Sequence, residues 1–396
     1  MSIYLDYQAT TPLAPEALAA MLPWLETQHA NPHSPHREGR VAKAAVEHAR
    51  AQVSALLPAG GRVAFTGGAT EALNWAIKGT SGAIVTLATE HAAVLDTVAA
   101  ERARGRAVTI LPVGRDGLVD LDAARAAIRP GTGLVAAMLV NNEIGVIQPI
   151  AELAALAHEA GALMLCDAVQ GYGRVAVPEA CDLVAISAHK IHGPKGIGAL
   201  WIRDGVGVEP LLHGGGQEAP GRSGTLSPAL CVGFGAAAVL MKERADEDAA
   251  HVERLWDAAV GAFGIPLPAR EGLGVGSERS ELPSGAPTPG PSLAGRGEWI
   301  LNGTPSSRYH GNLNIRREGL DVNRLLSDLR DIAFSAGSAC ASGSGRPSHV
   351  LRGIGLTDAE ARSSIRLGVG RYTTEDELTD ALTCIIAAAD AQRVAA

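Results

Sequence analysis

Two polar segments of the chain place nucleophilic side chains among small residues. The first, residues 187–196, carries Lys190 and Lys195, and it directly follows an apolar run typical of a buried strand, residues 183–186. A lysine in a dry crevice can react with an aldehyde, so either lysine could hold an aldehyde cofactor. Solvated surface lysines are the default for an isolated pair. The residues alone do not choose between Lys190 and Lys195.

The second segment, residues 335–345, surrounds Cys340 with Ser, Ala and Gly. Such a segment is flexible and leaves the thiol accessible, which a nucleophile that must move requires. A buried structural cysteine more often has large apolar neighbours. The chain has five cysteines and no C-x-x-C pair, which indicates neither a disulfide framework nor a cysteine-rich zinc site. We therefore interpret Cys340 as a reactive thiol in a reducing compartment.

Other polar residues directly follow predicted strands. Residues 66–71 lead into a predicted helix. The first backbone amides of that helix, together with the Thr70 hydroxyl, could bind a phosphate. The alternative is an ordinary turn with a capping threonine. Asp167 follows the apolar run 162–166, with Gln170 three residues on. At the carboxyl end of a strand, a carboxylate can pair with a cationic ring nitrogen. A helix N-cap is an equally good interpretation of Asp167.

Three further residues carry weaker signals. His91 begins a predicted helix, where it can cap the helix, lie on the surface or stack on an aromatic cofactor. Asn141 stands at the end of a predicted strand. Arg366 lies inside a short apolar strand. A buried arginine usually has an anionic partner, such as a substrate carboxylate. A structural ion pair within the protein is an equally common explanation. His189 and His192 lack acidic companions, so no metal site is predicted.

The elements that would position these residues alternate along the chain. Short apolar runs alternate with helical patterns, which predicts an α/β fold with a mainly parallel sheet covered on both faces. The predicted strands are 62–65, 83–87, 107–111, 134–140, 162–166, 183–186 and 199–202. The predicted helices are 15–27, 36–57, 70–78, 92–104, 121–128 and 150–160.

The C-terminal part of the sequence has a different character. One long Ala-rich helix, 228–263, is predicted to bridge two domains, and a smaller α+β domain follows it. Residues 268–298 are rich in Gly, Pro and Ser, cannot bury a core, and are predicted to form a flexible insertion. We predict a large domain at 13–245 and a small domain made of 1–12 and 246–396. The predicted elements of the small domain are strands 311–315 and 364–367 and helices 322–331 and 375–394.

Composition argues against two classes of partner. The chain has 396 residues, a formal net charge of −8 and no basic stripe, so nucleic-acid binding is not predicted. The first residues lack the basic and apolar regions of a signal peptide. The longest uncharged apolar stretch, 226–241, is shorter than the ~20 residues of a membrane span. We expect a cytoplasmic enzyme with no nucleic-acid or membrane partner.

Taken in sequence order, these motifs resemble the cysteine desulfurases of the NifS/IscS type, in class V of the aspartate-aminotransferase superfamily. The resemblance spans nearly the whole chain. It implies fold type I, an α/β fold whose large domain has a mainly parallel seven-stranded sheet and whose smaller C-terminal domain is α+β. The matching segments are 4–12, 31–34, 68–71, 90–91, 140–145, 167–170, 187–190, 193–196, 213–218, 222–225, 337–340 and 364–366.

The resemblance implies pyridoxal 5′-phosphate as the cofactor, bound covalently by Lys190 rather than Lys195. It also implies that Asp167 pairs with the pyridinium nitrogen, that Gln170 binds the ring hydroxyl, and that His91 stacks on the ring and helps to transfer protons. It further implies a homodimer with shared sites. The residues implied to bind the phosphate are Ala69, Thr70, Ser187, His189 and, reaching the site of the other subunit, Thr225.

The implied reaction converts L-cysteine to L-alanine. Asn141 and Arg366 would bind the substrate carboxylate, and Lys190 would remove the α-proton. The Cys340 thiolate would attack the substrate sulfur and hold it as a persulfide. The sulfur would then pass to an acceptor, such as an iron–sulfur scaffold protein, or be used in tRNA thiolation or cofactor biosynthesis. Selenocysteine lyase, another class V aminotransferase and a non-catalytic scaffold are the alternatives.

Two features depart from the family pattern. Gly67 occupies a position that serine often holds, which removes one hydrogen bond to a phosphate. The 268–298 insertion is unusual, but it is remote from every motif, so we expect it to be tolerated.

Overall fold

The computed structural model describes residues 2–218, 221–266, 298–337 and 348–394. Cys340 lies outside these residues, and so does the predicted insertion except for its last residue.

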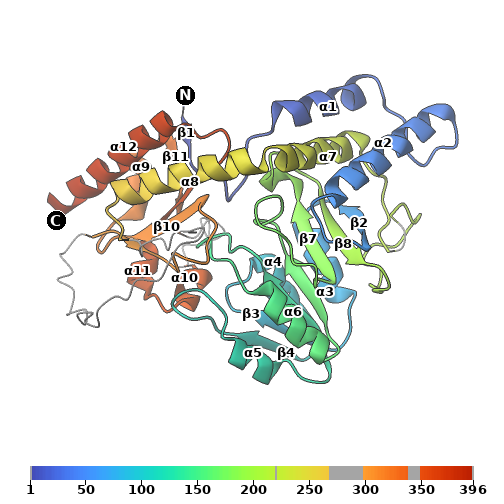
Figure 1. Ribbon diagram of the computed structural model, residues 1–396, viewed down its shortest axis with the longest axis horizontal. Coiled ribbons are helices and arrows are strands. Elements are labelled where there is room, and N and C mark those ends of the chain that lie inside the picture. Colours follow the sequence, from blue (N-terminus) through green and yellow to red (C-terminus); the bar gives the residue numbers. More distant parts are fainter. Residues whose placement is uncertain (1, 219–220, 267–297, 338–347, 395–396) are drawn as a thin grey trace, which may run out of the picture.

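In the described part of the chain, seven strands form the central sheet, in the order β2-β8-β7-β6-β5-β3-β4 (Figure 1). Strand β8 is antiparallel to both of its neighbours, and the other pairs are parallel. This confirms the prediction of a mainly parallel α/β sheet. The strands are β2 (Gly61–Thr66), β3 (Ala83–Leu87), β4 (Val108–Leu111), β5 (Thr132–Met138), β6 (Leu163–Asp167), β7 (Leu183–Ser187) and β8 (Gly198–Arg203).

The central strands are apolar along their length because both faces of the sheet are covered. In β7, Leu183 and Ala185 pack into one hydrophobic cluster, while Val184 and Ile186 pack into another on the opposite face. Alternate residues of a strand point to opposite faces, so a strand buried on both sides needs an unbroken apolar run. Because such apolar runs are visible in the sequence, the predicted strands lie within about two residues of the observed bounds.

Helices cover both faces of this sheet. Side chains of α3 and α4 belong to the cluster on one face, and those of α1, α2, α5, α6 and α7 belong to the cluster on the other. Within the described ranges, no helix is long and apolar enough to span a membrane. The helices are α1 (Pro15–Glu26), α2 (Arg37–Ser54), α3 (Ala69–Lys78), α4 (Ala92–Ala103), α5 (Leu121–Ala127), α6 (Ile150–Glu159) and α7 (Pro228–Glu243).

The prediction of one uninterrupted helix at 228–263 is wrong. Two helices, α7 and α8 (Ala245–Ala262), meet at Arg244, whose φ of −107° and ψ of 15° leave the helical region. The first turn of α8 carries three acidic side chains, a composition that favours a helix start. Figure 1 shows α7 and α8 as a nearly continuous yellow rod that runs from the large sheet to the C-terminal elements.

The C-terminal elements form a second layer with its own core. Four strands in the described residues form a sheet in the order β12-β13-β10-β9, and β1 pairs in parallel with β11. The strands are β1 (Ile3–Tyr4), β9 (Ile300–Leu301), β10 (Asn312–Arg316), β11 (Ile332–Ala333), β12 (Ser335–Ala336) and β13 (Ser364–Gly368). The helices are α9 (Val322–Asp328), α10 (His349–Gly353), α11 (Asp358–Arg362) and α12 (Glu375–Val394).

The N-terminal residues pack with this C-terminal layer. Leu5 shares a hydrophobic cluster with Trp256, Leu313, Ile365 and Leu382. This cluster is separate from the two that flank the large sheet. The separation supports the proposal that residues 1–12 join residues 246–396 in a small domain.

Candidate functional site

A cavity of about 610 Å³ lies at the carboxyl edge of the large sheet. Strand register explains why site residues meet there, since Ser187 lies opposite Gly198 and Asp167 lies opposite Met138. The edge is where ligands bind in open parallel sheets. The predicted site residues that line the cavity are Ala69, Thr70, His91, Asp167, Gln170, Ser187, His189, Lys190 and Arg366.

Lys190 ends a short 3₁₀ turn, Ala188–Lys190, that directly follows β7. Its ammonium group donates hydrogen bonds to the carbonyl oxygens of Gln8 and, at 2.7 Å, of Ala9. Lys195 also lines the cavity but is exposed. Lys190 therefore has fixed partners at the cavity wall, which favours it over Lys195 as the reactive amine.

Asp167 ends β6 and is buried, and its Oδ1 accepts the N–H of Val169 at 3.0 Å. Burial raises the pKa of Asp167 to about 6, although the Val169 hydrogen bond and the positive charge of Lys190 both lower it. A buried carboxylate with a raised pKa is stabilised by a cationic partner. Asp167 can therefore hold a protonated ring nitrogen.

Glu90 is a buried acid that the sequence analysis did not single out for chemistry. Its Oε1 accepts the N–H of Met138 at 2.8 Å. Burial, and then the neighbouring charge of Asp167, raise the pKa of Glu90 well above its usual value. Burial and the charge of Asp167 therefore both favour the protonated form of Glu90. The only sequence signal was its place in the motif with His91.

His91 and His189 are kept neutral. His91 caps α4, and its Nδ1 accepts the N–H of Ala93 at 3.0 Å, so the ring proton is on Nε2. Burial, Lys190 and His349 lower the pKa of His91. Burial, Lys190 and Lys195 lower the pKa of His189 to about 4. Both rings can therefore accept or donate hydrogen bonds without adding positive charge to the cavity.

The start of α3 forms the polar end of the cavity. Ala69 and Thr70 are its first residues, and its N-cap, Gly68, provides no side-chain cap. A side chain at Gly68 would have open space around its Cβ. The first amides of a helix lack intrahelical partners and attract anions. This end of the cavity suits a phosphate.

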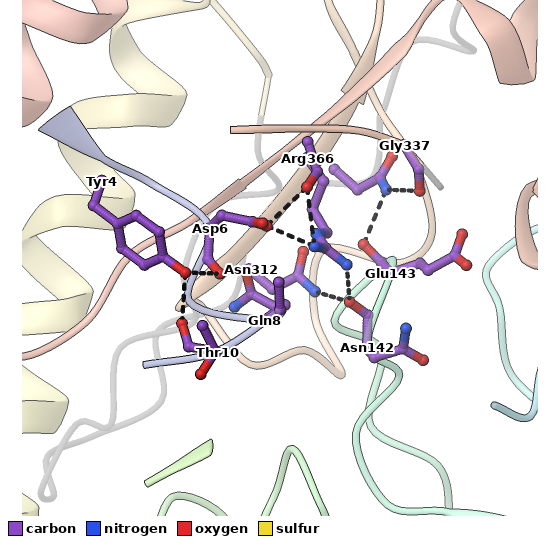
Figure 2. A network of polar contacts seen from close by, with 12 residues as sticks. Tyr4, Asp6, Gln8, Thr10, Asn142, Glu143, Asn312, Gly337 and Arg366 are labelled. Carbon is purple, nitrogen blue, oxygen red and sulfur yellow. Dashed lines mark hydrogen bonds and ion pairs between the residues drawn. The ribbon is translucent and has the colours of Figure 1, made fainter. Parts of the chain in front are cut away.

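Arg366 enters from the proposed small domain, in the middle of β13, and is only 1% exposed. Figure 2 shows its guanidinium between Asp6 and Asn142. Nη2 donates to Asp6 Oδ1 at 2.7 Å, and Nη1 donates to the Asn142 carbonyl at 3.0 Å. The sequence predicted an anionic partner for this arginine but did not identify Asp6, although the 4–12 motif contained it.

Asn141 and Thr225 do not line the cavity. The Asn141 amide donates to the Thr89 carbonyl at 2.9 Å, and its oxygen accepts the N–H groups of Glu143 and Ile144. These bonds hold the turn after β5 and bring Asn142, rather than Asn141, to the cavity wall. Thr225 is exposed. The roles of both residues stay predictions.

Residues 8–10 form a wall of the cavity that the sequence analysis quoted as a motif without assigning a role. Gln170 donates to the Gln8 carbonyl at 2.9 Å, and His189 Nδ1 lies 3.1 Å from Thr10 Oγ1. The Gln8 side chain in turn donates to the Gly311 carbonyl, just before β10, at 2.7 Å. This segment belongs to the proposed small domain, and through Gln170 and His189 it contacts the proposed large domain at the site.

The profile of the family Aminotransferase class-V matches residues 3–264. The chain is 41% identical to the cysteine desulfurase IscS of Rickettsia bellii (strain OSU 85-389), over 97% of this chain and 90% of the relative. It is 44% identical to the mitochondrial cysteine desulfurase of Saccharomyces cerevisiae (strain ATCC 204508 / S288c), over 95% of this chain and 72% of the relative. The chain belongs to the cysteine desulfurases of the class-V aminotransferase family.

Solved structures of this family have the same fold. A NifS-like protein from Rickettsia africae ESF-5 superposes with a TM-score of 0.83 at 26% identity, covering 98% of this chain and 100% of that one. SspA in complex with cysteine superposes with a TM-score of 0.75 at 30% identity, covering 94% of this chain and 100% of that one. The family and the fold predicted from the motifs are confirmed.

Proposed function

We propose that the chain is a cysteine desulfurase that uses pyridoxal 5′-phosphate, converts L-cysteine to L-alanine, and passes the sulfur through Cys340 to an acceptor protein. The observation that carries this proposal is the meeting of Lys190, Asp167 and Arg366 in one cavity of a chain from this family. An amine, a buried acid and a guanidinium are the groups that an aldehyde cofactor and an amino-acid substrate require.

The residues of the cavity fit the cofactor. Asp167 is a buried carboxylate that a pyridinium nitrogen would stabilise. The uncapped start of α3, with Thr70, and the neutral His189 and Ser187 suit the phosphate. Lys190 would bind the aldehyde carbon. When bound, pyridoxal 5′-phosphate supplies an electron sink for the negative charge that loss of the α-proton creates.

The proposed roles of the protein groups follow from their chemistry. Lys190 Nζ takes the α-proton of the substrate, and neutral His91, with its proton on Nε2, covers the ring and assists proton transfer. Gln170 binds the ring hydroxyl. Arg366 pairs with the substrate carboxylate, and Asn141 supports this contact through its turn.

Sulfur transfer is assigned to Cys340. Its thiolate attacks the sulfur atom of L-cysteine, a sulfur–sulfur bond forms, and the carbon–sulfur bond of the substrate breaks. The electron pair of that bond stays with the carbon skeleton, which takes up a proton and leaves as L-alanine. The persulfide then passes to an acceptor such as an iron–sulfur scaffold protein.

The test measures L-alanine and sulfide released from L-cysteine in the presence of a reductant. Wild type should release both, and Cys340→Ala should release neither. Cys384→Ala is the matched control, because Cys384 is an exposed free thiol on α12 that does not line the cavity. Equal release by wild type and Cys340→Ala would overturn the role of Cys340 and favour a general lyase. Turnover of L-selenocysteine but not L-cysteine would favour a selenocysteine lyase.

A homodimer with shared sites is part of the proposal. Thr225 is exposed and precedes α7, so it is available to reach the phosphate in the other subunit. A native mass of twice the 40.7 kDa chain is expected. Thr225→Ala should weaken cofactor retention without changing that mass. A monomer of full activity would contradict the shared site.

A further inference from the structure

Asp6 lies behind the proposed carboxylate site, in contact with Arg366, which lines the cavity. Its Oδ1 accepts a hydrogen bond from Arg366 Nη2 at 2.7 Å (Figure 2). The same oxygen accepts the Ser335 hydroxyl at 2.9 Å. Ser335 and Arg366 are register partners on the adjacent strands β12 and β13. The carboxylate therefore bridges two strands of the small-domain sheet at the point where Arg366 reaches the cavity.

The backbone holds Asp6 in this place. The N–H of Leu5 donates to the Ala333 carbonyl, and the Leu5 carbonyl accepts the N–H of Gly368, each at 2.7 Å. The Tyr4 hydroxyl lies 2.9 Å from the Thr10 carbonyl, which closes the segment from its other side. The contact between Asp6 and Arg366 is therefore a fixed feature of the small domain.

Asp6 supplies the charge that balances Arg366. Among the described residues, the Asp6 carboxylate forms the ion pair with this guanidinium. Glu143 also lies nearby, but its carboxyl group is hydrogen-bonded by the Ser348 hydroxyl, and burial raises the pKa of Glu143. A buried guanidinium without a counter-ion destabilises a folded protein strongly. Asp6 therefore stabilises the substrate-free site.

We propose that Asp6 is the internal counter-ion of Arg366 and sets how tightly the cavity binds the α-carboxylate of its amino-acid ligands. This inference rests on the proposed role of Arg366 in binding that carboxylate. A ligand carboxylate brings a second negative charge to a guanidinium that Asp6 already neutralises, so Asp6 weakens its binding. L-alanine, the product, carries the same carboxylate, so Asp6 also favours product release.

The variant Asp6→Asn separates charge from orientation. Asparagine keeps an oxygen acceptor for Arg366 and Ser335, so the guanidinium keeps its position while the negative charge is lost. The holoenzyme variant should bind L-alanine on the order of tenfold more tightly than wild type, as measured by its thermal shift against ligand concentration. L-Alaninamide, which has no carboxylate, should bind both proteins equally. The KM for L-cysteine should fall.

A second ion pair provides the matched control. Arg371 and Asp248 form a pair with side-chain exposures of 2% and 16%, close to the 1% and 20% of Arg366 and Asp6. The two pairs differ in their arginines, because Arg366 lines the catalytic cavity and Arg371 does not. Both Asp248→Asn and Asp6→Asn should lower Tm, because each leaves a buried guanidinium without its counter-ion. Only Asp6→Asn should change the affinity for L-alanine.

The measurements on wild type and on Asp6→Asn separate failure of the proposed function from failure of the role of Asp6. If wild type neither binds nor forms L-alanine, the proposed function fails, and the role of Asp6 fails with it. If wild type binds L-alanine and Asp6→Asn binds it equally or more weakly, the role of Asp6 alone is overturned. Ser335→Ala provides a second test should Asp6→Asn not fold. This variant keeps the negative charge of Asp6 and removes the hydroxyl that donates to it. The affinity for L-alanine should therefore stay equal or fall. Tighter binding of L-alanine would overturn the inference.

Discussion

The two sides of the cavity are assembled in different ways. On the large-domain side, Asp167 ends a strand and Lys190 follows one in a tight turn. On the small-domain side, Arg366 lies in the middle of a strand, and its partners Asp6 and Asn142 are 360 and 224 positions away in the sequence. One side is made of element ends, and the other is made of contacts between distant segments.

The electrostatics of the two sides also differ. Asp167 is buried beside Glu90 with a raised pKa, so its charge is poorly compensated until a cation joins it. Arg366 already has Asp6 as its counter-ion. We infer that the large-domain side depends on the bound cofactor for its charge balance, whereas the small-domain side is balanced in advance. Changes on the first side should affect turnover and cofactor binding, and changes on the second should affect substrate binding.

Lys190→Ala should have the largest effect on the large-domain side. It removes both the attachment point of the cofactor and the proposed base, so kcat should fall by about a thousandfold or more. The absorbance band of a covalently bound cofactor should disappear, while the circular dichroism spectrum stays that of wild type. Lys195→Ala, at an exposed lysine that lines the same cavity, is the control and should retain the band. Loss of the band in Lys195→Ala alone would reverse the assignment.

Arg366→Gln should act on the small-domain side through substrate binding. Removing a charge-assisted contact with the carboxylate should raise the KM for L-cysteine about a hundredfold, with the cofactor band unchanged. The single variant also leaves Asp6 without its partner, so Tm should fall. The double variant Asp6→Asn/Arg366→Gln should recover Tm but not KM. If Arg366→Gln and Lys190→Ala changed the same kinetic parameter, the distinction between the two sides would fail.

This difference in assembly explains what the sequence could predict. Asp167 directly follows an apolar run, and Lys190 and Thr70 come within five residues of one. Local pattern places such residues at the edge of a parallel sheet. The contact between Asp6 and Arg366 depends on the pairing of β13 with β12 and on the path of the N-terminal segment. No local periodicity encodes that pairing.

The limits of sequence prediction in the fold have similar physical causes. The break at Arg244 was missed because α7 and α8 both have helical periodicity, and a single residue interrupts them. Helices α10 and α11 have five residues each, too few for periodicity to be detected. In contrast, α12 was predicted with its observed bounds, Glu375–Val394, because it is long and begins with three acidic residues.

The pH dependence of stability should reveal the uncompensated charge of Asp167. The pKa of Asp167 in the folded protein is about 6, above its ordinary 3.8, so the folded state holds this proton more tightly than the unfolded state. Its contribution to stability is complete below pH 4 and is lost as the pH rises through about 6. Relative to Asp167→Asn, cofactor-free wild type should lose about 3 kcal/mol of unfolding free energy between pH 4 and pH 7.

Urea unfolding of both cofactor-free proteins at several pH values measures this difference. Adding pyridoxal 5′-phosphate should restore the stability of wild type at pH 7 and do much less for Asp167→Asn. Parallel pH profiles of the two proteins would show that the Asp167 carboxylate is already compensated in the absence of the cofactor. The contrast between the two sides of the cavity would then be wrong.

The smallest effect is expected at Gly67, where serine is the residue often found in the family. The Gly67 N–H donates to Glu71 Oε2 at 2.7 Å, and a Cβ at this position would lie 3.0 Å from that same oxygen. Glu71 is also bound by Arg222 at 2.8 Å, so it can shift only partly away. A serine hydroxyl would add one donor for the phosphate, while its Cβ would disturb the Glu71 contact.

The added hydroxyl donor and the disturbed Glu71 contact oppose each other, and each is worth about 1 kcal/mol. Gly67→Ser should therefore keep the dissociation constant of the cofactor within about fivefold of wild type. Gly67→Ala has the same Cβ without the hydroxyl, so it separates the two contributions. Gly67→Ser should bind the cofactor a few-fold more tightly than Gly67→Ala in a fluorescence titration of the cofactor-free protein. Equal binding by both variants would mean that the hydroxyl does not reach the phosphate and that the start of α3 binds it through backbone amides and Thr70.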